Sequence, residues 1–310
     1  MIKRFAIKKI VIITLSFVFL LIIYLFPKNE KYSIHSTLSY ITPETMPIYL
    51  VDNNNNMVSR FEIIKKSENI NELIEEIIKN LTIGDTDNNI PERFKKIIPK
   101  GTKIISKDLK NGILKINFTK ELLNITKDNE EKMLETIIYS LTEVKDIKKI
   151  MIFVNGEKLK QLPNSKKNLP NLLDRSYGIN KVYELESFKN VTKITTYYVN
   201  KSDNYLYYTP VTLVTNNNKE KIEVIIENLK SAPTYDTNLV SYLRTSAILE
   251  NYEILENSVN LSFNNEVLSL EEDKIIEEVK YSIALSIRDS YDISETIFYV
   301  DNRLIDVHFI

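Results

Sequence analysis

Several residue types that carry chemistry are absent or rare in this sequence of 310 residues, which has no cysteine, no tryptophan, 5 glycines and 2 histidines. The lack of cysteine excludes disulfides, thiolate nucleophiles and an acylated lipoprotein cysteine. The few glycines form none of the patterns G-x-G-x-x-G, G-x-x-x-x-G-K-(S/T) or G-x-S-x-G, so no phosphate-binding loop or serine-hydrolase turn is indicated. The 41 basic and 42 acidic residues nearly cancel, and nucleic-acid binding, which needs a basic face, is not expected.

Catalytic or metal chemistry has few residues to draw on. A zinc site or a Ser-His-Asp triad would need His35 or His308, and no motif surrounds any serine. Glu75 and Glu76, or the run Asp128–Glu131, could pair as carboxylates for glycan cleavage. They fit better as the solvent-facing side of one helix and the negatively charged start of another. We therefore predict no enzymatic activity, and no catalytic, cofactor-binding or metal-binding residues.

The longest uncharged hydrophobic run lies close to the N-terminus, at residues 10–26, after the basic residues Lys3, Arg4, Lys8 and Lys9. This length is near the lower limit of roughly 17–25 residues for a membrane-spanning helix, and the preceding positive charges favour a cytoplasmic N-terminus. No small-x-small site follows, so an uncleaved signal anchor is favoured over a cleaved signal peptide. We predict a single-pass cell membrane protein with residues 1–27 as cytoplasmic N-terminus and anchor, 28–44 as tether, and the remainder extracytoplasmic.

The rest of the sequence contains an internal repeat. Ile77–Leu81 reappears as Ile225–Leu229, an offset of 225 − 77 = 148, and Tyr49–Val51 corresponds to Tyr197–Val199 at the same offset. Two further matches follow in the same order at offsets of 145 and 146: Leu114–Phe118 with Val259–Phe263, and Ile152–Asn155 with Phe298–Asp301. Two long copies indicate tandem globular domains rather than a solenoid. We predict a first domain at 45–160, a linker at 161–190 and a second, more divergent domain at 191–310.

Hydrophobic periodicity predicts the same elements in both copies. In the first copy we expect strands at 46–51, 58–65, on either side of Asn111-Gly112 and at 149–154, with helices at 69–82 and 128–144. In the second we expect strands at 195–200, 205–214, 259–263, 296–300 and 304–309, with helices at 219–229 and 271–288. The predicted fold class is α+β: two tandem small domains, each a mainly antiparallel sheet with two helices on one face, behind a transmembrane helix.

Tyrosines gather on the predicted opening hairpin of the second copy: Tyr197, Tyr198, Tyr205, Tyr207 and Tyr208. Exposed aromatic side chains of this kind can bind a protein partner or a sugar, so these five form our candidate interface. The alternative is that β-propensity alone places tyrosine in strands.

The ordered set of motifs resembles the GerMN domain of bacterial sporulation and germination proteins. The residues that carry the resemblance are Pro47–Val51, Ile77–Leu81, Ile98–Thr102, Leu114–Phe118, Leu141–Val144 and Ile152–Gly156, with Arg175–Asn180 similar to the segment that joins two such domains. The second copy departs from the pattern, with Tyr242–Thr245 in place of Pro-x-Gly-Thr and Asp301-Asn302 in place of Asn155-Gly156.

The resemblance implies a ring-building-like domain fold and a non-enzymatic protein of the cell envelope, active in sporulation or germination. It implies a scaffold that supports or localises a transenvelope complex, with envelope or sporulation-complex proteins as partners. Members of the family can be lipoproteins, whereas this chain has no cysteine and would attach to the membrane through its one N-terminal helix. The alternative is a peptidoglycan-binding cell-envelope module without catalysis. The family offers no catalytic residues to carry over.

Overall fold

A computed structural model describes residues 45–310, except 66, 85–89, 188, 203–204, 232–237 and 271–272. These residues belong to one compact unit, Glu44–Ile310. In the described part of the chain, no helix has both the length and the apolar character needed to cross a membrane. The predicted anchor at 10–26 and tether at 28–44 lie outside the described residues.

The described part of the first copy contains the strands and helices that periodicity predicts, in the predicted order, and two short strands that it does not predict, Phe94–Lys95 and Glu157–Lys158. The elements are β1 (Thr45–Asp52), β2 (Val58–Lys65), α2 (Ile70–Leu81), β3 (Phe94–Lys95), β4 (Ile104–Lys110), β5 (Ile113–Phe118), α3 (Lys127–Leu141), β6 (Lys149–Val154) and β7 (Glu157–Lys158), with the 3-10 turn η1 (Lys120–Leu123) before α3. The side chain of Asn69 caps α2 by accepting from the amides of Asn71 and Glu72. The hairpin predicted at Asn111-Gly112 is confirmed, with positive φ at both residues.

The second copy repeats this order after a connecting segment that contains η2 (Arg175–Tyr177) and β8 (Val182–Glu184). Its elements are β9 (Thr192–Ser202), β10 (Tyr205–Thr215), α4 (Lys221–Leu229), β11 (Leu239–Val240), β12 (Leu249–Ile254), β13 (Ser258–Phe263), η3 (Asn265–Val267), α5 (Glu277–Tyr291), β14 (Glu295–Val300) and β15 (Arg303–Phe309). The turn between β14 and β15 keeps positive φ at Asp301 and Asn302, so it matches the Asn155-Gly156 turn of the first copy despite the changed residues.

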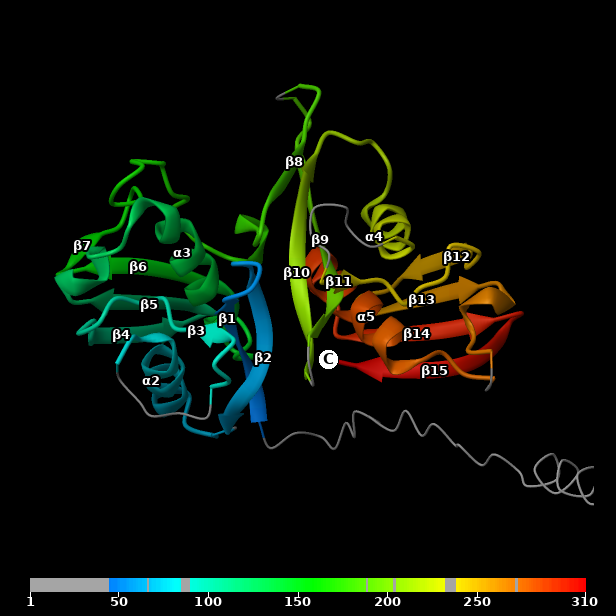
Figure 1. The fold of residues 1–310 in the computed structure, drawn as a ribbon, viewed down its shortest axis with the longest axis horizontal. Coiled ribbons are helices and arrows are strands. Elements are labelled where there is room, and N and C mark those ends of the chain that lie inside the picture. The colour runs from blue at the N-terminus through cyan, green and yellow to red at the C-terminus, as the bar shows by residue number, and fades with distance from the viewer. Residues whose placement is uncertain are drawn as a thin grey trace, which may run out of the picture. The chain divides into compact units, whose positions relative to one another are not determined.

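The strands form three sheets rather than the expected one per copy. Each copy has its own four-stranded sheet, in the orders β4-β5-β6-β7 and β12-β13-β14-β15. The opening hairpins of both copies instead join into one seven-stranded sheet, β11-β9-β10-β2-β1-β3, with β8 paired to β10. Figure 1 shows β2 and β10 side by side between the two four-stranded sheets. The prediction of separate sheets was wrong because strand patterns reveal which face of a strand is buried, not which strand lies next to it.

Within each four-stranded sheet the central pair is parallel and the outer pairs are antiparallel. The parallel pair arises because a helix, α3 or α5, connects its two strands. The sheets are therefore mainly antiparallel, as predicted, and the α+β class is confirmed.

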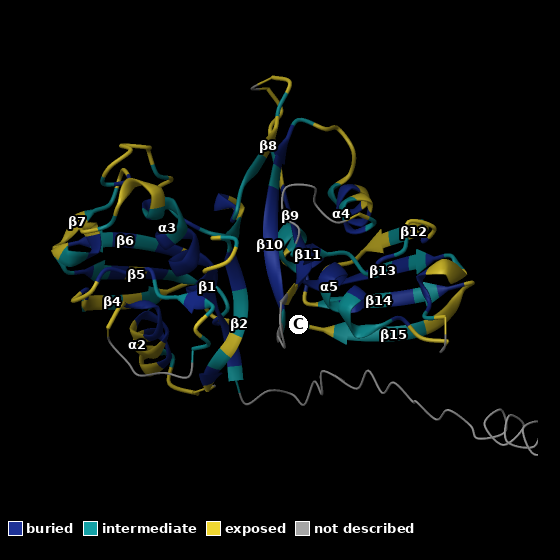
Figure 2. Ribbon diagram, in the orientation of Figure 1, coloured by how far each residue is buried: buried dark blue, intermediate teal, exposed yellow. Residues whose placement is uncertain are grey.

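Helix α3 is buried on more sides than its sequence suggests. Periodicity predicts one apolar side that includes Met133, Ile137 and Leu141, but every residue from Met133 to Leu141 is buried. Of the polar residues among them, Glu135 contacts the connecting segment, whereas Ser140 accepts from the Tyr49 amide of β1. Strands β1 and β10 of the seven-stranded sheet are also largely buried (Figure 2).

Helix α5 begins and ends later than predicted, at Glu277 rather than 271 and at Tyr291 rather than 288. Its N-cap residue Ile276 has extended backbone angles, φ −66° and ψ 150°, so the apolar stripe counted through Ile275 and Ile276 starts before the helix itself. Ile275 is buried all the same, because a hydrophobic side chain can reach the core from the segment that leads into a helix.

Candidate functional site: the interface between the two copies

Four of the five candidate tyrosines lie inside the protein. Tyr197, Tyr198, Tyr207 and Tyr208 are all buried, so the prediction that they present an exposed aromatic surface is wrong for these four. Tyr198 belongs to the second copy's own core, whereas the other three share a core with the first copy. Both copies supply strands to the seven-stranded sheet at this point, and the strands of the other copy cover tyrosine rings that a separate domain would leave exposed. The side chain of Tyr205 is outside the described set.

Arg175 is the centre of the interface between the copies. Its Nη1 donates to Asp289 Oδ1 at 2.7 Å and its Nη2 donates to Glu143 Oε1 at 2.7 Å. The guanidinium carbon lies 4.8 Å from the centroid of the Tyr139 ring. Glu143 follows α3 and Asp289 lies in α5, so one arginine from the connecting segment binds a carboxylate of each copy.

Two buried tyrosines complete this cluster with matching geometry. The Tyr49 hydroxyl donates to Glu143 Oε1 at 2.9 Å, and the Tyr197 hydroxyl donates to Asp289 Oδ2 at 2.5 Å. The two hydroxyl oxygens are 2.9 Å apart, and Arg175 Nη1 also reaches the Tyr197 hydroxyl at 3.2 Å. A buried tyrosine needs a partner for its hydroxyl, and here each finds a carboxylate and its own counterpart.

A serine in each long helix holds the backbone of these tyrosines. The Tyr49 amide donates to Ser140 Oγ at 2.8 Å, and the Tyr197 amide donates to Ser286 Oγ at 2.9 Å. The offsets are 197 − 49 = 148 and 286 − 140 = 146, close to those of the sequence repeat. Tyrosine, serine and carboxylate are thus one structural unit that the duplication has preserved.

Electrostatics explain why acidic groups are tolerated at this depth. The Glu143 side chain is 6% exposed and the Asp289 side chain is 0% exposed. Burial alone raises the pKa of Glu143, but the charges of Arg288 and Arg175 outweigh it and hold that pKa well below its ordinary value of 4.5. Arg288 Nη2 lies 2.9 Å from Glu143 Oε1. Glu143 therefore stays ionised at neutral pH and pairs with both arginines.

We expect the ion pairs of Glu143 to make the protein acid-labile. A carboxyl whose pKa is lower in the folded state contributes stability above its ordinary value of 4.5 and loses it as the pH falls further. The loss is about 1.4 kcal/mol for each unit of depression. Buried Glu135 opposes this loss of stability, because burial raises the pKa of Glu135. Urea unfolding of wild type and Glu143→Gln between pH 7 and pH 3 should give free energies of unfolding that converge as the pH falls.

A matched control for the acid experiment is Glu227→Gln, since Glu227 makes an exposed ion pair with Lys219. Its free energy of unfolding should follow the wild-type pH dependence. Glu143→Gln curves that run parallel to wild type down to pH 3 would contradict the assignment.

A second polar cluster joins the copies at the neighbouring strands. Asp52 of β1 is fully buried, and its Oδ2 accepts from the Tyr207 hydroxyl at 2.5 Å. Arg93 Nη2 lies 3.3 Å from the same oxygen, and its guanidinium carbon is 5.0 Å from the Tyr207 ring centroid. The matching residue of the second copy, Asn200, donates to Asp52 at 3.5 Å. A carboxylate of the first copy thus binds side chains from both copies.

The connecting segment 175–182 is built into the interface. Asn180 accepts from the Val58 amide at 2.8 Å and donates to the carbonyls of Val58 and Pro210 at 2.7 Å each, so it bridges β2 and β10. Gly178 has φ +85° and ψ 162°, a region open essentially only to glycine. A Cβ there would also meet Thr212 Cγ2 at 3.0 Å.

The polar side of α3 receives this connecting segment. Glu135 pairs with Lys181 and accepts from the Asn180 amide at 3.1 Å, while the Tyr139 hydroxyl donates to the Arg175 carbonyl at 2.9 Å. These contacts explain why α3 is buried beyond its apolar stripe. Residues 161–190, predicted as a linker, therefore include the side chains that bind both copies.

The carboxylates considered from the sequence lie on two different helices, α2 and α3. Glu75 and Glu76 are exposed, as predicted, and Glu75 pairs with Lys107. The prediction of a solvated helix start was wrong for Glu130, which is buried and accepts from the amides of Asn164 and Ser165. It is buried because the chain after β7 folds back over this end of α3. Among the described residues, no group of three or more metal-ligating side chains comes together.

The contacts between the copies follow an approximate twofold symmetry. Tyr49 meets Tyr197 and Asp52 meets Asn200, and each of these pairs is separated by 148 residues in the sequence. Across β2 and β10, Ser59 Oγ lies 2.7 Å from Thr209 Oγ1, and the two residues hold the same register position in their hairpins. Contact between a residue and its own counterpart marks the axis of an isologous interface. The two copies thus associate as the subunits of a homodimer do, although they share one chain.

Comparison with known proteins agrees with this architecture. Residues 47–160 match the Germane family, described as sporulation and spore germination. A solved structure, the tandem GerMN domains of the sporulation protein GerM from Bacillus subtilis, superposes with a TM-score of 0.75 at 25% identity, over 84% of this chain and 91% of that one. The first copy thus matches the family model, and the chain as a whole is similar to a solved pair of tandem GerMN domains.

One relative in particular matches most of the chain. Spore germination protein GerM of Bacillus subtilis (strain 168) is 25% identical over 265 residues, which cover 83% of this chain and 71% of that protein. The resemblance found in the motifs of the sequence is confirmed.

Proposed function

We propose that this protein is a membrane-anchored extracytoplasmic scaffold in sporulation or spore germination, which supports or localises a transenvelope complex through protein contacts and performs no chemistry of its own. The observation that carries the proposal is the buried cluster around Arg175, which holds two GerMN domains in one arrangement. A scaffold depends on such rigidity, because docking surfaces on two domains act together only when their geometry permits simultaneous contact.

The cellular process and the location rest on further support. The similarity to a spore germination protein favours sporulation or germination as the process. The basic residues followed by the uncharged run at 10–26 favour attachment through one N-terminal helix. Envelope or sporulation-complex proteins are the proposed partners, and sheet edges or helix faces of the two domains are the proposed docking surfaces.

The test is localisation of the full chain, fused at its C-terminus to a protein that fluoresces outside the cytoplasm, through a sporulation time course in its own host. We expect enrichment at the membranes that separate the mother cell and forespore, and fewer mature spores after deletion of the gene. The matched control is residues 1–44 with the same fluorescent protein, which should spread evenly over the membrane because it lacks both domains.

An even distribution of the full chain, together with normal spore numbers after deletion, would contradict the scaffold function. If the protein showed that result and was also retained by purified peptidoglycan, the alternative, a wall-binding module without catalysis, would be favoured.

A further inference from the structure

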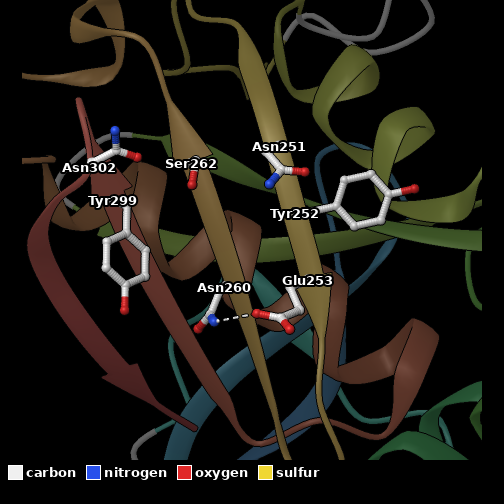
Figure 3. A pocket seen from close by; sticks show the side chains of 7 residues that line it. All are labelled: Asn251, Tyr252, Glu253, Asn260, Ser262, Tyr299 and Asn302. Atoms are coloured by element: carbon white, nitrogen blue, oxygen red, sulfur yellow. Dashed lines mark hydrogen bonds between the residues drawn. The ribbon is translucent and has the colours of Figure 1, made fainter.

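A hollow lies on the outer face of each four-stranded sheet, away from the domain interface. The hollow of the second copy has a volume of about 220 Å³, and its polar side chains come from β12, β13, β14 and the turn after β14: Asn251, Glu253, Asn260, Ser262, Tyr299 and Asn302. Figure 3 shows these side chains, with the ring of Tyr252 pointing away from the others. The hollow of the first copy includes Ser106, Asp108, Lys115, Asn117, Phe153 and Gly156.

The two hollows occupy the same place in the fold, as the strand registers show. Asp108 pairs with Lys115 as Glu253 pairs with Asn260. In the parallel pair, Asn117 lies beside Phe153 in the first copy. Its counterpart Ser262 lies beside Tyr299 in the second copy. The residues paired in one hollow therefore have counterparts at the same positions in the other.

The second copy has exchanged charge and apolar surface for neutral hydrogen-bonding groups. The cation Lys115 is replaced by Asn260, and Ser106 by Asn251. The resulting surface has three primary amides and no basic residue among the residues that line it. Each amide offers both a donor and an acceptor.

Two further replacements act in the same direction. The ring of Phe153 gains a hydroxyl in Tyr299, and Gly156 becomes Asn302. Tyr299 is half-buried, so its ring remains partly open to the hollow. Asn302 keeps the positive φ of the glycine it replaces, 59° against 85°, so the added amide is accommodated by the same turn.

One acceptor in the second hollow has no partner. Asn260 Nδ2 donates to Glu253 Oε2 at 3.2 Å, while Asn260 Oδ1 is buried and makes no hydrogen bond within the described residues. A buried acceptor without a partner is uncommon and costly, so Asn260 gains if a rotation of its side chain lets a donor in the hollow reach this oxygen.

We propose that this hollow binds a neutral saccharide that carries acetamido groups. The three asparagine amides match the donor and acceptor of an acetamido group, and the open ring of Tyr299 offers a face for a sugar ring. Glu253 is the one charged side chain among the lining residues, and a carboxylate disfavours an anionic ligand. The volume is below the roughly 300–1,000 Å³ of pockets for drug-sized molecules, which suits one or two sugar units. This inference does not rest on the scaffold function, which needs no such site.

The test uses the full chain and two uncharged tetrasaccharides, the β-1,4-linked tetramer of N-acetylglucosamine and cellotetraose, which lacks the acetamido groups. Dissociation constants would be measured by titration in saturation-transfer difference NMR. We expect the acetamido tetramer to bind about tenfold more tightly than cellotetraose, because only the tetramer has acetamido groups that can pair with the asparagine amides. Equal binding of both sugars, or no saturable binding at about 10 mM, would overturn the proposal.

Variants that restore the first copy's residues locate the site without disturbing the fold. The double change Tyr299→Phe with Asn302→Gly should weaken binding of the acetamido tetramer roughly tenfold through the lost hydrogen bonds. Far-ultraviolet circular dichroism should show an unchanged fold, since both residues occur at the same places in the first copy. The matched control is Phe153→Tyr, which changes the other hollow and should leave affinity at the wild-type value.

Co-sedimentation with purified peptidoglycan glycan strands identifies the source of the ligand. Retention that is lost in the double variant would identify wall glycan, whereas binding of the soluble tetramer alone would identify a free oligosaccharide. Affinity that falls in Phe153→Tyr but not in the double variant would place binding in the first copy and refute the assignment.

Discussion

Replacement of Arg175 by methionine is expected to lower the free energy of unfolding by about 3–5 kcal/mol, the cost of removing one partner from a buried ion pair. Arg175 binds Glu143 and Asp289 at 2.7 Å each, and Arg288 of α5 is a second arginine that contacts both carboxylates, at 2.9 Å and 3.2 Å. Methionine keeps much of the side-chain volume, so the loss reports the charge and its hydrogen bonds. Because the chain has no tryptophan, urea unfolding should be followed by far-ultraviolet circular dichroism and tyrosine fluorescence.

The shape of the Arg175→Met transition carries additional information. With the link between the copies weakened, we expect unfolding in two steps in place of one, since each copy retains a large hydrophobic core. The control is Arg303→Met, whose exposed side chain lies 3.3 Å from Asp273 and should contribute little. A wild-type midpoint and a single transition in Arg175→Met would show that the cluster does not couple the domains.

Replacement of Asp52 by alanine is expected to have a similar effect, again about 3–5 kcal/mol. The change removes the buried carboxylate that faces Arg93 and accepts from the Tyr207 hydroxyl. Asp52→Asn should cost less, because asparagine keeps one acceptor oxygen and occurs at the matching position as Asn200. In thermal unfolding monitored by circular dichroism, the midpoint temperature should be highest for wild type, lower for Asp52→Asn and lowest for Asp52→Ala.

Asp108→Ala is the control for Asp52, since Asp108 is an exposed strand residue whose neighbour is Lys110 at 3.3 Å. It should unfold close to the wild-type midpoint. If Asp52→Ala matched Asp108→Ala, the buried cluster would contribute nothing to the association of the copies.

Much of each domain could be predicted from local patterns. The apolar stripe of α2 and the Asn111-Gly112 hairpin are local features, and the structure confirms them at nearly the predicted bounds. The repeat with its offset of 148 residues also indicated two related domains. These signals suffice because helix faces, turns and duplications are recorded within short stretches of sequence.

The interface between the copies could not be predicted in the same way. Burial of Tyr197 and Tyr207 depends on β2 and β10 lying side by side, and nothing in either strand specifies that pairing. In the sequence, Arg175 stands out only as part of the segment that resembles a family junction. Its role needs the positions of Glu143 and Asp289, which are 146 residues apart in the sequence. Tyrosines at matching repeat positions are a signal of the interface, but their pattern fits an exposed surface as well as a buried one.

Arg175 occupies a place that no pair of separate, identical domains could fill with a single cation. In a homodimer every residue occurs twice, so an arginine near the axis between Tyr49 and Tyr197 would meet its own copy. The connecting segment occurs once, and it therefore supplies one positive charge to two acids from opposite domains. Fusion after duplication thus did more than raise the local concentration of one domain near the other: it allowed an asymmetric residue to stabilise a symmetric interface.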